Sequence, residues 1–424
     1  MLALVAALGA SGPAFASGFG LNEGSADWLG NAFAGEVAKA YDASTVSTNP
    51  AGMALLDSSE LDSNVSYIGP SATFTGSASN PYTGGNVSGV NGGNAVAPAA
   101  SAAAFGVWAL APKWRLGFSV TAPYGERVSY PGDFVGRYQS LVSSITDINL
   151  GLALSYKIND HFSVGGGPNI DYFNANLSQA LNTPLSALTG KDAIGDIYGD
   201  DVGVGYNLGA IYKVDDTLRF GLDYRSRIRH NIKGGQHITV PPIYAAYSPL
   251  LAAMLNAANS HATTNITLPD SVSFGVYDQV TPRLALMASA TWTEWSLFHA
   301  LVVTATNGSG SSTLYENWHN SWFAGVGANY QLTDKLMLQT GFSYDESPVS
   351  NDNRTTRVPD ADHYNLGIGA QYQLLPNTKL ELAYLHLFSP GGKINNSASA
   401  SAGMITGGYD DSDNSVTAGV TMKF

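Results

Sequence analysis

The chain has 424 residues, of which only 12% are charged and 44% are hydrophobic, with 47 glycines and no cysteine. An average soluble domain carries about a quarter charged residues, so this composition argues against an ordinary water-exposed surface. Disulfide frameworks, thiolate metal sites and cysteine nucleophiles are excluded, and the net charge of −13 argues against nucleic acid as a partner.

The first 58 residues divide into two parts. Residues 1–16 are small and apolar and end in Ala14-Phe15-Ala16, which predicts a signal peptide, although the usual basic start is missing, as in a trimmed or misassigned N-terminus. Residues 17–58 follow neither the helical nor the strand period, so we expect short helical turns. That pattern alone leaves both a disordered leader and a folded plug open.

Within this segment, Asn49-Pro50-Ala51 predicts a sharp bend. The residue before a proline is pushed out of the helical region, and asparagine is common in such turns. We expect the Asn49 side-chain amide to be exposed at this bend. An ordinary loop before the first strand is the alternative.

From about Leu61 the sequence alternates with a period of two, as in Ile148, Leu150, Leu152 and Leu154. The intervening residues are mostly Gly, Asn, Ser, Thr and Gln, which suit a polar interior, and the apolar rows often end in Tyr or Trp. Beyond the N-terminus no apolar run reaches the roughly 18 to 20 residues that a spanning helix requires. We therefore predict an all-β fold, a fourteen-stranded antiparallel transmembrane barrel with strands near 60–74, 101–111, 113–130, 143–157, 162–178, 202–213, 217–233, 264–278, 283–305, 313–332, 335–346, 361–374, 378–393 and 407–424.

The connections between the strands differ in length at the two ends. Short turns, such as residues 157–160, are expected on the periplasmic side, and long insertions near 179–201, 234–265 and 346–361 on the extracellular side. The last strand ends in Phe424, a terminal aromatic typical of bacterial outer-membrane barrels. This residue predicts recognition by the barrel-assembly machinery, and the exterior predicts contact with outer-membrane lipid and lipopolysaccharide.

Several motifs together resemble the FadL-type family of outer-membrane transporters for long-chain fatty acids and other hydrophobic compounds. They begin with Ser17-Gly18-Phe19, Gly30-Asn31-Ala32-Phe33 and Asn49-Pro50-Ala51, and continue with Thr293-Glu294-Trp295-Ser296, Tyr344-Asp345-Glu346-Ser347-Pro348-Val349 and Val358-Pro359-Asp360. The resemblance covers essentially the whole mature chain. It implies that residues 17–58 form a hatch inside a barrel of residues 59–424, and that the third strand kinks inward and opens the wall sideways. The sequence has no nucleotide-binding motif and no evident energy-coupling box, so we expect passive uptake, and we expect a monomer.

The third strand carries residues that favour such an opening. Its alternation stops at Pro123-Tyr124-Gly125, where proline cannot donate to the ladder and glycine tolerates a bulge. A harmless edge proline is the weaker alternative because a closed barrel has no edge. We expect Pro123, Tyr124 and Gly125, together with Asn49, Pro50 and Ala51, to gate release.

Two groups of residues are candidates for ligand binding. Phe19 and Leu21 are expected to bound an inner pocket, and the segment Ile243–Leu255, with Leu250, Leu251 and Met254, is too apolar for a loop exposed to water. We interpret it as both a capture surface and a cap helix on the barrel mouth. We expect a ligand-binding groove beside this segment, with Ala180, Leu181, Leu185 and Leu188 of the other long loop as its second wall.

The polar end of the inner pocket departs from the family pattern. The resemblance implies two basic side chains that meet a carboxylate, and the aligned positions here are Gln179 and His319, the latter next to Trp318. Neither Gln179 nor His319 is a permanent cation. The ligand is therefore left open between fatty acids and uncharged aromatic or aliphatic hydrocarbons.

Motifs for catalysis or cofactors are missing from the sequence. The eight histidines are scattered without metal-ligand spacing, and neither a nucleophile elbow nor a P-loop occurs. Asp410-Asp411-Ser412-Asp413-Asn414 resembles a calcium loop but is better interpreted as an acidic hairpin at the barrel rim. We expect no enzyme, cofactor or metal. The alternatives are a hydrolase using Ser343 and His386, an adhesin, or an aqueous porin, which the hatch argues against.

Overall fold

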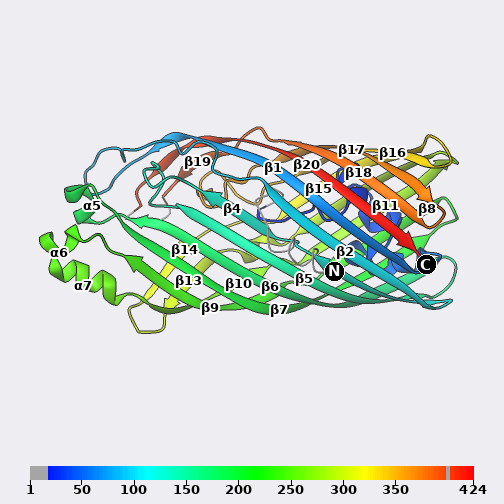
Figure 1. Cartoon of the computed structure of the whole chain (residues 1–424), viewed down its shortest axis with the longest axis horizontal. Coiled ribbons are helices and arrows are strands. Elements are labelled where there is room, and N and C mark those ends of the chain that lie inside the picture. The colour runs from blue at the N-terminus through cyan, green and yellow to red at the C-terminus, as the bar shows by residue number, and fades with distance from the viewer. Residues whose placement is uncertain (1–17, 398–401) are drawn as a thin grey trace.

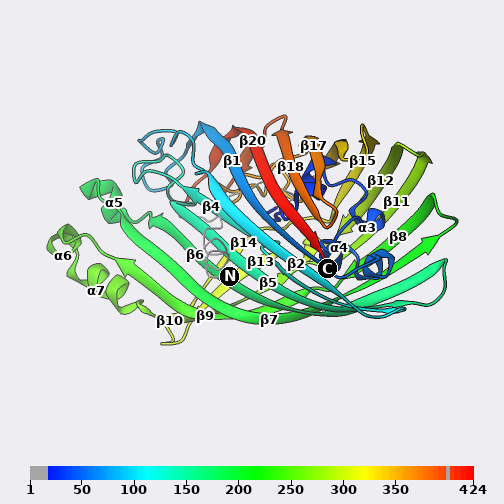
Figure 2. The same ribbon diagram turned by 45° about the vertical axis from the view of Figure 1, so that its right-hand side comes forward.

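A computed structural model describes residues 18–397 and 402–424, so the predicted signal peptide lies outside the described residues. The chain forms one long antiparallel barrel, with three short helices at one end (Figures 1 and 2). Its strand elements are β1 (Glu60–Ala78), β2 (Ala99–Ala111), β3 (Trp114–Thr121), β4 (Gly125–Ser129), β5 (Val142–Lys157), β6 (Phe162–Leu181), β7 (Ala193–Lys213), β8 (Leu218–Arg225), β9 (Ile228–Thr239), β10 (Ser260–Leu268), β11 (Ser271–Thr281), β12 (Leu284–Thr293), β13 (Ala300–Ala305), β14 (Ser311–Tyr315), β15 (Ser321–Gln331), β16 (Leu336–Asp345), β17 (His363–Leu375), β18 (Thr378–Phe388), β19 (Lys393–Asn396) and β20 (Ile405–Lys423).

The predicted number of fourteen barrel strands is confirmed. Six barrel strands are each broken into two elements, namely β3/β4, β8/β9, β10/β11, β12/β13, β14/β15 and β18/β19. The barrel closes where β1 pairs with β20 over their whole length, from Glu60–Lys423 to Ala78–Ile405. Closure leaves neither the first nor the last strand with a free edge.

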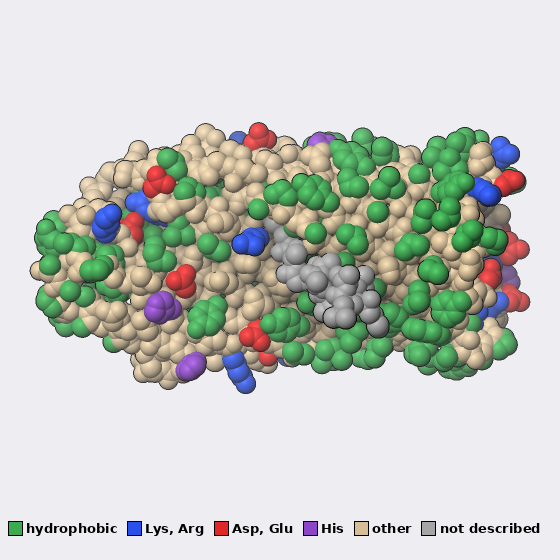
Figure 3. Space-filling model, in the orientation of Figure 1, with side chains coloured by type: hydrophobic (Ala, Val, Ile, Leu, Met, Phe, Trp, Pro, Cys, Tyr) green, Lys and Arg blue, Asp and Glu red, His purple; other side chains and the backbone are tan. Residues whose placement is uncertain are grey.

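The alternating pattern places apolar side chains outside, as predicted. Leu150, Leu152 and Leu154 of β5 are each about 40% exposed, whereas Asn149 and Ser155 on the other face are buried in the lumen. In Figure 3, hydrophobic side chains cover much of the right-hand half of the barrel face, and charged side chains gather at its right-hand end. This arrangement buries polar groups inside and presents apolar groups to lipid.

Two predicted extracellular loops are shorter than expected. β6 and β7 remain paired up to Leu181–Ala193, so the insertion near 179–201 reduces to residues 182–192 with helix α5 (Pro184–Thr189). The insertion near 234–265 reduces to residues 240–259, with α6 (Ile243–Tyr247) and α7 (Pro249–Ala257). Backbone pairing continues through residues rich in Gly and Asp, whose side chains give no apolar alternation. The calcium-loop pattern at Asp410 to Asn414 likewise lies within β20, not in a hairpin.

The hatch fills the lumen with four short helices, visible inside the barrel in Figure 2. They are α2 (Ala26–Gly30), α3 (Glu36–Lys39), α4 (Thr45–Thr48) and the 3-10 helix η1 (Pro50–Leu55), and most of their residues are buried. None of the helices in residues 18–397 and 402–424 is long and apolar enough to cross a membrane.

Lumen-facing glycines let the barrel wall approach the hatch backbone closely. A Cβ atom at Gly209 would lie 2.0 Å from Asn49 Oδ1, one at Gly221 would lie 2.0 Å from the Val37 carbonyl oxygen, and one at Gly341 would lie 1.9 Å from the Asn31 carbonyl oxygen. These separations are too short for any side chain. The wall therefore meets the hatch directly, at two backbone carbonyl oxygens and at the Asn49 side chain.

Candidate functional site: a two-part lumen and a break in the wall

The Asn49-Pro50-Ala51 turn fastens the hatch to the wall. Asn49 has extended backbone angles, as expected before proline, and its side-chain Oδ1 accepts a hydrogen bond from the Ala51 N–H at 3.1 Å. Its Nδ2 donates to the carbonyl oxygens of Val37 at 2.7 Å and Ala210 at 3.2 Å. Asn49 is fully buried, so the predicted exposed amide is wrong. The lumen encloses the turn, and each polar atom of the amide bonds to protein.

Buried charges hold the part of the hatch that contains α2 and α3. Lys39 Nζ lies 3.0 Å from Asp27 Oδ2, and both side chains are 2% exposed. Asp27 Oδ1 also accepts hydrogen bonds from the Gln339 and Gln371 amides of the wall, each at 2.8 Å. Charges are tolerated in such a dry place only when they are paired and hydrogen-bonded. The network therefore fixes the hatch against the wall.

The third barrel strand is interrupted at the predicted place. Residues 122–124 separate β3 from β4, and the N-terminal segment, residues 18–21, pairs with them on the lumen side. The Leu21 N–H donates to the Pro123 carbonyl at 2.8 Å, and the Gly125 N–H donates to the Phe19 carbonyl at 3.0 Å. The hatch thus supplies the hydrogen bonds that a neighbouring strand would otherwise make.

The interruption leaves a break between β2 and the third strand. Their ladder runs from Ala111–Trp114 to Ala104–Val120, and in the described part of the chain no ladder joins Ala99–Ala103 to β3 or β4. An isolated bridge between Val96 and Val128 closes the wall further toward the extracellular end. The wall is therefore interrupted over a limited length.

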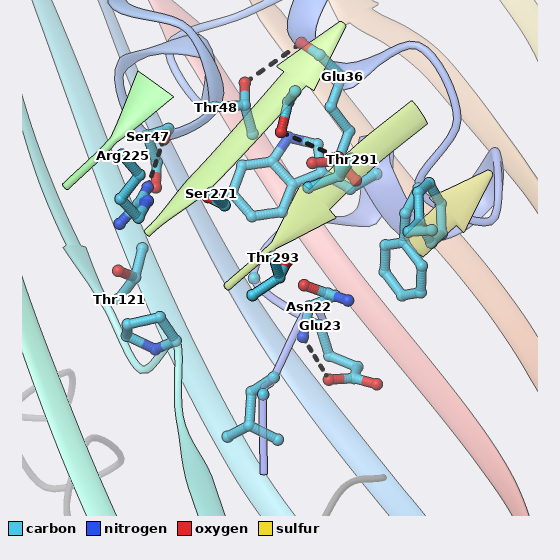
Figure 4. A pocket seen from close by; sticks show the side chains of 18 of the residues that line it. Asn22, Glu23, Glu36, Ser47, Thr48, Thr121, Arg225, Ser271, Thr291 and Thr293 are labelled. Atoms are coloured by element: carbon cyan, nitrogen blue, oxygen red, sulfur yellow. Dashed lines mark hydrogen bonds between the residues drawn. The ribbon is translucent and has the colours of Figure 1, made fainter. Parts of the chain in front are cut away.

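A polar chamber lies behind this break (Figure 4). It contains about 1360 Å³ of space free of protein atoms, its open ends included, and Ser101, Ala122 and Pro123 line it at the wall. Figure 4 shows Arg225, Glu36 and several hydroxyl side chains around it, with Arg225 donating to the Ser47 carbonyl at 2.7 Å. Burial, and then the nearby Asp413, raises the pKa of the hatch residue Glu23 to about 7.

An apolar cavity occupies the lumen on the extracellular side of the hatch. Its lining is mainly aliphatic and aromatic and includes Ile145, Phe173, Leu177, Ile232, Leu301 and Val303. About 750 Å³ inside it is free of protein atoms, its open end included. Three ionisable side chains, Glu126, Glu316 and Arg357, share this lining.

Arg357 is the permanent cation that sequence reasoning missed. Burial lowers its pKa to about 10, against the opposing effect of Glu316 and Glu126, so the guanidinium stays charged at neutral pH. It comes from the loop between β16 and β17, where Thr355 to Asp360 are buried inside the barrel mouth. The signal that could have found it is an arginine directly before the family motif Val358-Pro359-Asp360.

An aromatic cluster separates the apolar cavity from the polar chamber. Phe19 lies at its centre, with ring centroids 5.0 Å from Trp295, 5.7 Å from Tyr124, 5.8 Å from Phe298 and 5.6 Å from Trp318. Phe19 and Phe298 line the apolar cavity, while Tyr124 and Trp295 line the polar chamber. Phe19 and its neighbours thus form the partition between the two spaces.

The structure brings only some of the predicted ligand residues to these spaces. Phe19 lines the apolar cavity, Leu21 lines the polar chamber, and Trp318 is buried against Phe19. Gln179 lies behind Arg357, whose Nη2 donates to Gln179 Oε1. His319 is exposed, with Nδ1 2.9 Å from the Asn320 carbonyl oxygen, so its predicted place in the pocket is wrong.

The extracellular helices combine a small core with an apolar surface. Tyr244 is fully buried against α5 and packs with Leu185 and Ala252. Leu251 is partly buried in the same cluster, whereas Leu250 and Met254 are 73% and 61% exposed. Figures 1 and 2 show these helices projecting from one end of the barrel. A folded and apolar surface therefore stands beside the mouth.

Comparisons with known proteins agree with this architecture. The family described as Outer membrane protein transport protein (OMPP1/FadL/TodX) matches residues 7–424. The chain is 27% identical to the Long-chain fatty acid transport protein of Salmonella typhi, over 90% of both chains. It is 30% identical to the 47 kDa outer membrane protein of Pasteurella multocida, over 89% of this chain and 88% of that one.

Solved structures show the same fold. The crystal structure of a Pseudomonas aeruginosa FadL homologue matches with a TM-score of 0.90 and 25% identity, over 96% of this chain and all of that one. The Ralstonia pickettii toluene transporter TbuX matches with a TM-score of 0.66 and 16% identity, over 95% of this chain and 99% of that one. The chain therefore belongs to the OMPP1/FadL/TodX family and is a non-enzymatic transporter of hydrophobic compounds in the bacterial outer membrane.

Proposed function

We propose that this chain takes up long-chain fatty acids passively and releases them sideways through the break beside the third strand. The observation that carries this proposal is the position of Phe19. Its ring lines the apolar cavity, while its carbonyl oxygen accepts the hydrogen bond of Gly125 at the interruption. A ligand that displaces the ring also disturbs the pairing that covers the break.

Capture is assigned to the extracellular helices. Exposed apolar side chains of this size commonly mark a binding surface, and Leu250 and Met254 offer them beside the mouth, with Leu251 beneath. Leu188 of α5 is 63% exposed and extends the same apolar surface. From there a ligand reaches the apolar cavity without crossing the hatch.

Release is assigned to the N-terminal segment, with the Asn49-Pro50-Ala51 turn as its fixed base. Three backbone hydrogen bonds tie the segment to its surroundings: Leu21 N–H to the Pro123 carbonyl, Gly125 N–H to the Phe19 carbonyl, and Gly18 N–H to Asp360 Oδ2 at 3.0 Å. The rest of the hatch is held in addition by the buried ion pairs Lys39–Asp27 and Lys379–Asp42. Local rearrangement of residues 18–21 therefore costs less free energy than departure of the whole hatch.

A ligand with a polar head is favoured over a pure hydrocarbon. Arg357, Glu126 and Glu316 line an otherwise apolar cavity, and buried polar groups need partners. Relatives named as long-chain fatty acid transport proteins support the same class. Uptake of uncharged hydrocarbons by the same route is the alternative, since a toluene transporter has the same fold.

The test is uptake of labelled oleate and of labelled toluene in a host that lacks its own transporter. We expect the chain to restore oleate uptake and growth on oleate, with a smaller effect on toluene. Restoration of toluene uptake alone would favour the alternative. Restoration of neither would contradict transport of both ligand classes.

A further inference from the structure

The three helices at the extracellular end carry a second apolar surface, separate from the one that faces the membrane. In Figure 3, hydrophobic side chains gather at the left-hand end, where Figure 1 places α5, α6 and α7, and a region with few of them lies between this group and the hydrophobic band on the right. Exposed residues of β9 on the way to the helices include Arg229, Asn231 and Lys233. Since the hydrophobic band lies in the bilayer, the helices stand beyond it, and lipid of the same membrane does not cover them.

This surface, called the apolar tip here, is free of charge over a long stretch. Residues 240–259, which contain α6 and α7, include neither an acidic nor a basic residue. The large exposed side chains of the three helices are Leu188, Ile243, Tyr247, Leu250 and Met254. A contiguous apolar surface of this kind marks a place that another apolar body covers.

The polar side chains of the same stretch bond within the protein. Ser248 Oγ accepts a hydrogen bond from the Leu251 N–H at 3.3 Å and caps α7. Asn256 Nδ2 donates to the Ala252 carbonyl at 2.9 Å, and both amide atoms of Asn259 bond to the backbone of β9. A protein interface of ordinary size uses roughly ten direct hydrogen bonds. The apolar tip offers few groups for such bonds, so its contacts are apolar and without direction, as contacts with lipid are.

A small core keeps the apolar tip in shape. The Tyr244 side chain is fully buried beneath it, and its hydroxyl donates to the Lys191 carbonyl at 2.9 Å. Both α5 and α7 start with a proline, Pro184 and Pro249, whose fixed φ suits the first turn of a helix. Because this core already fills the inner side, Leu250 cannot turn inward to leave water. Only an apolar phase outside the protein can cover it.

We propose that the apolar tip inserts into the surface of lipid aggregates outside the cell, such as droplets and micelles. An uncharged apolar surface fits the acyl chains of such a phase, and Tyr247 has the apolar ring and polar hydroxyl that suit its boundary with water. Insertion itself goes beyond the proposed function, because it requires no transported ligand. Its consequence for uptake rests on that function: the chain draws fatty acid directly from an aggregate, which holds most of a sparingly soluble supply.

The experiment measures flotation of the full chain with triolein droplets that are coated with phosphatidylcholine and carry no net charge. The chain is placed in lipid nanodiscs, which cover its membrane-facing band and leave the apolar tip free, and empty nanodiscs are the blank. We expect roughly tenfold more loaded discs than empty discs to float with the droplets. Added salt should leave this result unchanged, because the contact is apolar. Flotation equal to that of empty discs, or flotation lost in high salt, would overturn the proposal.

A double variant tests whether the apolar tip is the part that inserts. Leu250→Ser combined with Met254→Ser changes two mostly exposed side chains, so the barrel should stay folded, which heat-modifiable migration checks. We expect flotation to weaken by about tenfold or more, since burial of either side chain in an apolar phase is favourable. Unchanged flotation in this variant would contradict insertion of the apolar tip.

The matched control changes two exposed side chains outside the apolar tip. Val302→Ser combined with Tyr315→Ser alters the paired strands β13 and β14, where both side chains are exposed. This variant should float as the unaltered chain does. A loss equal to that of the Leu250 and Met254 variant would overturn the assignment to the helices.

Triolein droplets contain no fatty acid to transport, so failure of this proposal is distinguishable from failure of the proposed function. Uptake of oleate without flotation would overturn insertion and leave the proposed function standing. Flotation without uptake of oleate or toluene would support insertion and contradict the proposed function. Association of loaded discs with one another in the absence of droplets, lost in the Leu250 and Met254 variant, would assign the apolar tip to a second copy of the chain and overturn the proposal.

Discussion

Two of the interruptions in the barrel wall are closed by different means. Beside the third strand, the cover is the N-terminal segment, held there by backbone hydrogen bonds of Leu21 and Gly125. On another side of the barrel, β8/β9 breaks at residues 226–227 and β10/β11 breaks at residues 269–270. There the wall closes itself with its own side chains.

An ion cluster holds the second interruption. Asp270 Oδ2 lies 2.5 Å from an Arg227 nitrogen, and Arg227 Nη2 lies 2.7 Å from Glu294 Oε2. Asp270 Oδ1 also accepts hydrogen bonds from the Tyr224 hydroxyl at 2.7 Å and from the Arg227 N–H at 2.9 Å. These contacts link three neighbouring barrel strands. Opening this interruption would break several charged hydrogen bonds together.

The difference indicates which interruption is suited to release. A cover made from a separate segment can leave without unpairing the wall, whereas a cover made from the wall's own ions cannot. Proline alone does not decide the matter. Pro168 lies in β6, where it pairs with Tyr206 of β7 and the ladder with that strand is continuous. An exit requires a strand that has left its neighbour and a cover that can move.

The largest expected effect follows from closing the break beside the third strand. Replacing Pro123 and Gly125 together with valine restores a backbone donor and adds two strand-forming side chains. A Cβ at Gly125 would lie 2.8 Å from Leu21 Cδ1, so the end of the Leu21 side chain would have to shift. We expect oleate uptake to be abolished while heat-modifiable migration of the folded barrel is retained.

Pro168→Val is the matched control for that variant, because it alters a strand proline whose ladder with β7 is continuous, although the ladder with β5 skips Gly167 and Pro168. Its uptake should equal that of the unaltered chain. Normal uptake in the variant with both Pro123 and Gly125 replaced would place the exit elsewhere.

The second effect concerns the fixed part of the hatch. Lys39→Met leaves the Asp27 carboxylate buried without its cation. Removing one partner of a buried ion pair lowers the stability of the folded state by about 3–5 kcal/mol. We expect hydrogen exchange of the hatch amides between Ala26 and Leu55 to accelerate accordingly. Adding Asp27→Asn removes the stranded charge and should restore most of the protection. Equal exchange in the single variant and the unaltered chain would mean that this pair does not anchor the hatch.

The smallest effect concerns the second interruption. Asp270→Asn keeps the shape of the side chain but weakens the charged hydrogen bonds from Arg227, which should cost about 1–3 kcal/mol locally. We expect faster hydrogen exchange at the Arg227 and Glu294 amides and unchanged oleate uptake. A loss of uptake as severe as that of the third-strand variant would remove the distinction between the two interruptions.

Sequence patterns were sufficient for the wall and the break but not for the polar end of the cavity. The side chains of β5 alternate because one face meets lipid and the other meets a crowded lumen, so the strand can be recognised from the sequence. Pro123 and Gly125 act through their own backbone constraints. Glu126, Glu316 and Arg357 come from three distant segments, and only closure of the barrel brings them into one cavity.

The misplaced histidine has a simple physical cause. Between β14 and β15 the side chains still alternate: Glu316 and Trp318 are buried, and Asn317 and His319 are exposed. An error of one residue in aligning this segment moves a side chain from the lumen to the outside. The predicted segment is therefore the correct one, but its buried residues are Glu316 and Trp318, not His319.

The backbone fit between glycines and hatch has a consequence for engineering. A hatch grafted from a relative would have to follow the same path past Gly209, Gly221 and Gly341, and any larger residue there would need a compensating detour. Chimaeras should therefore exchange the hatch together with the strands that enclose it. Although far apart along the chain, the two behave as a single unit of inheritance.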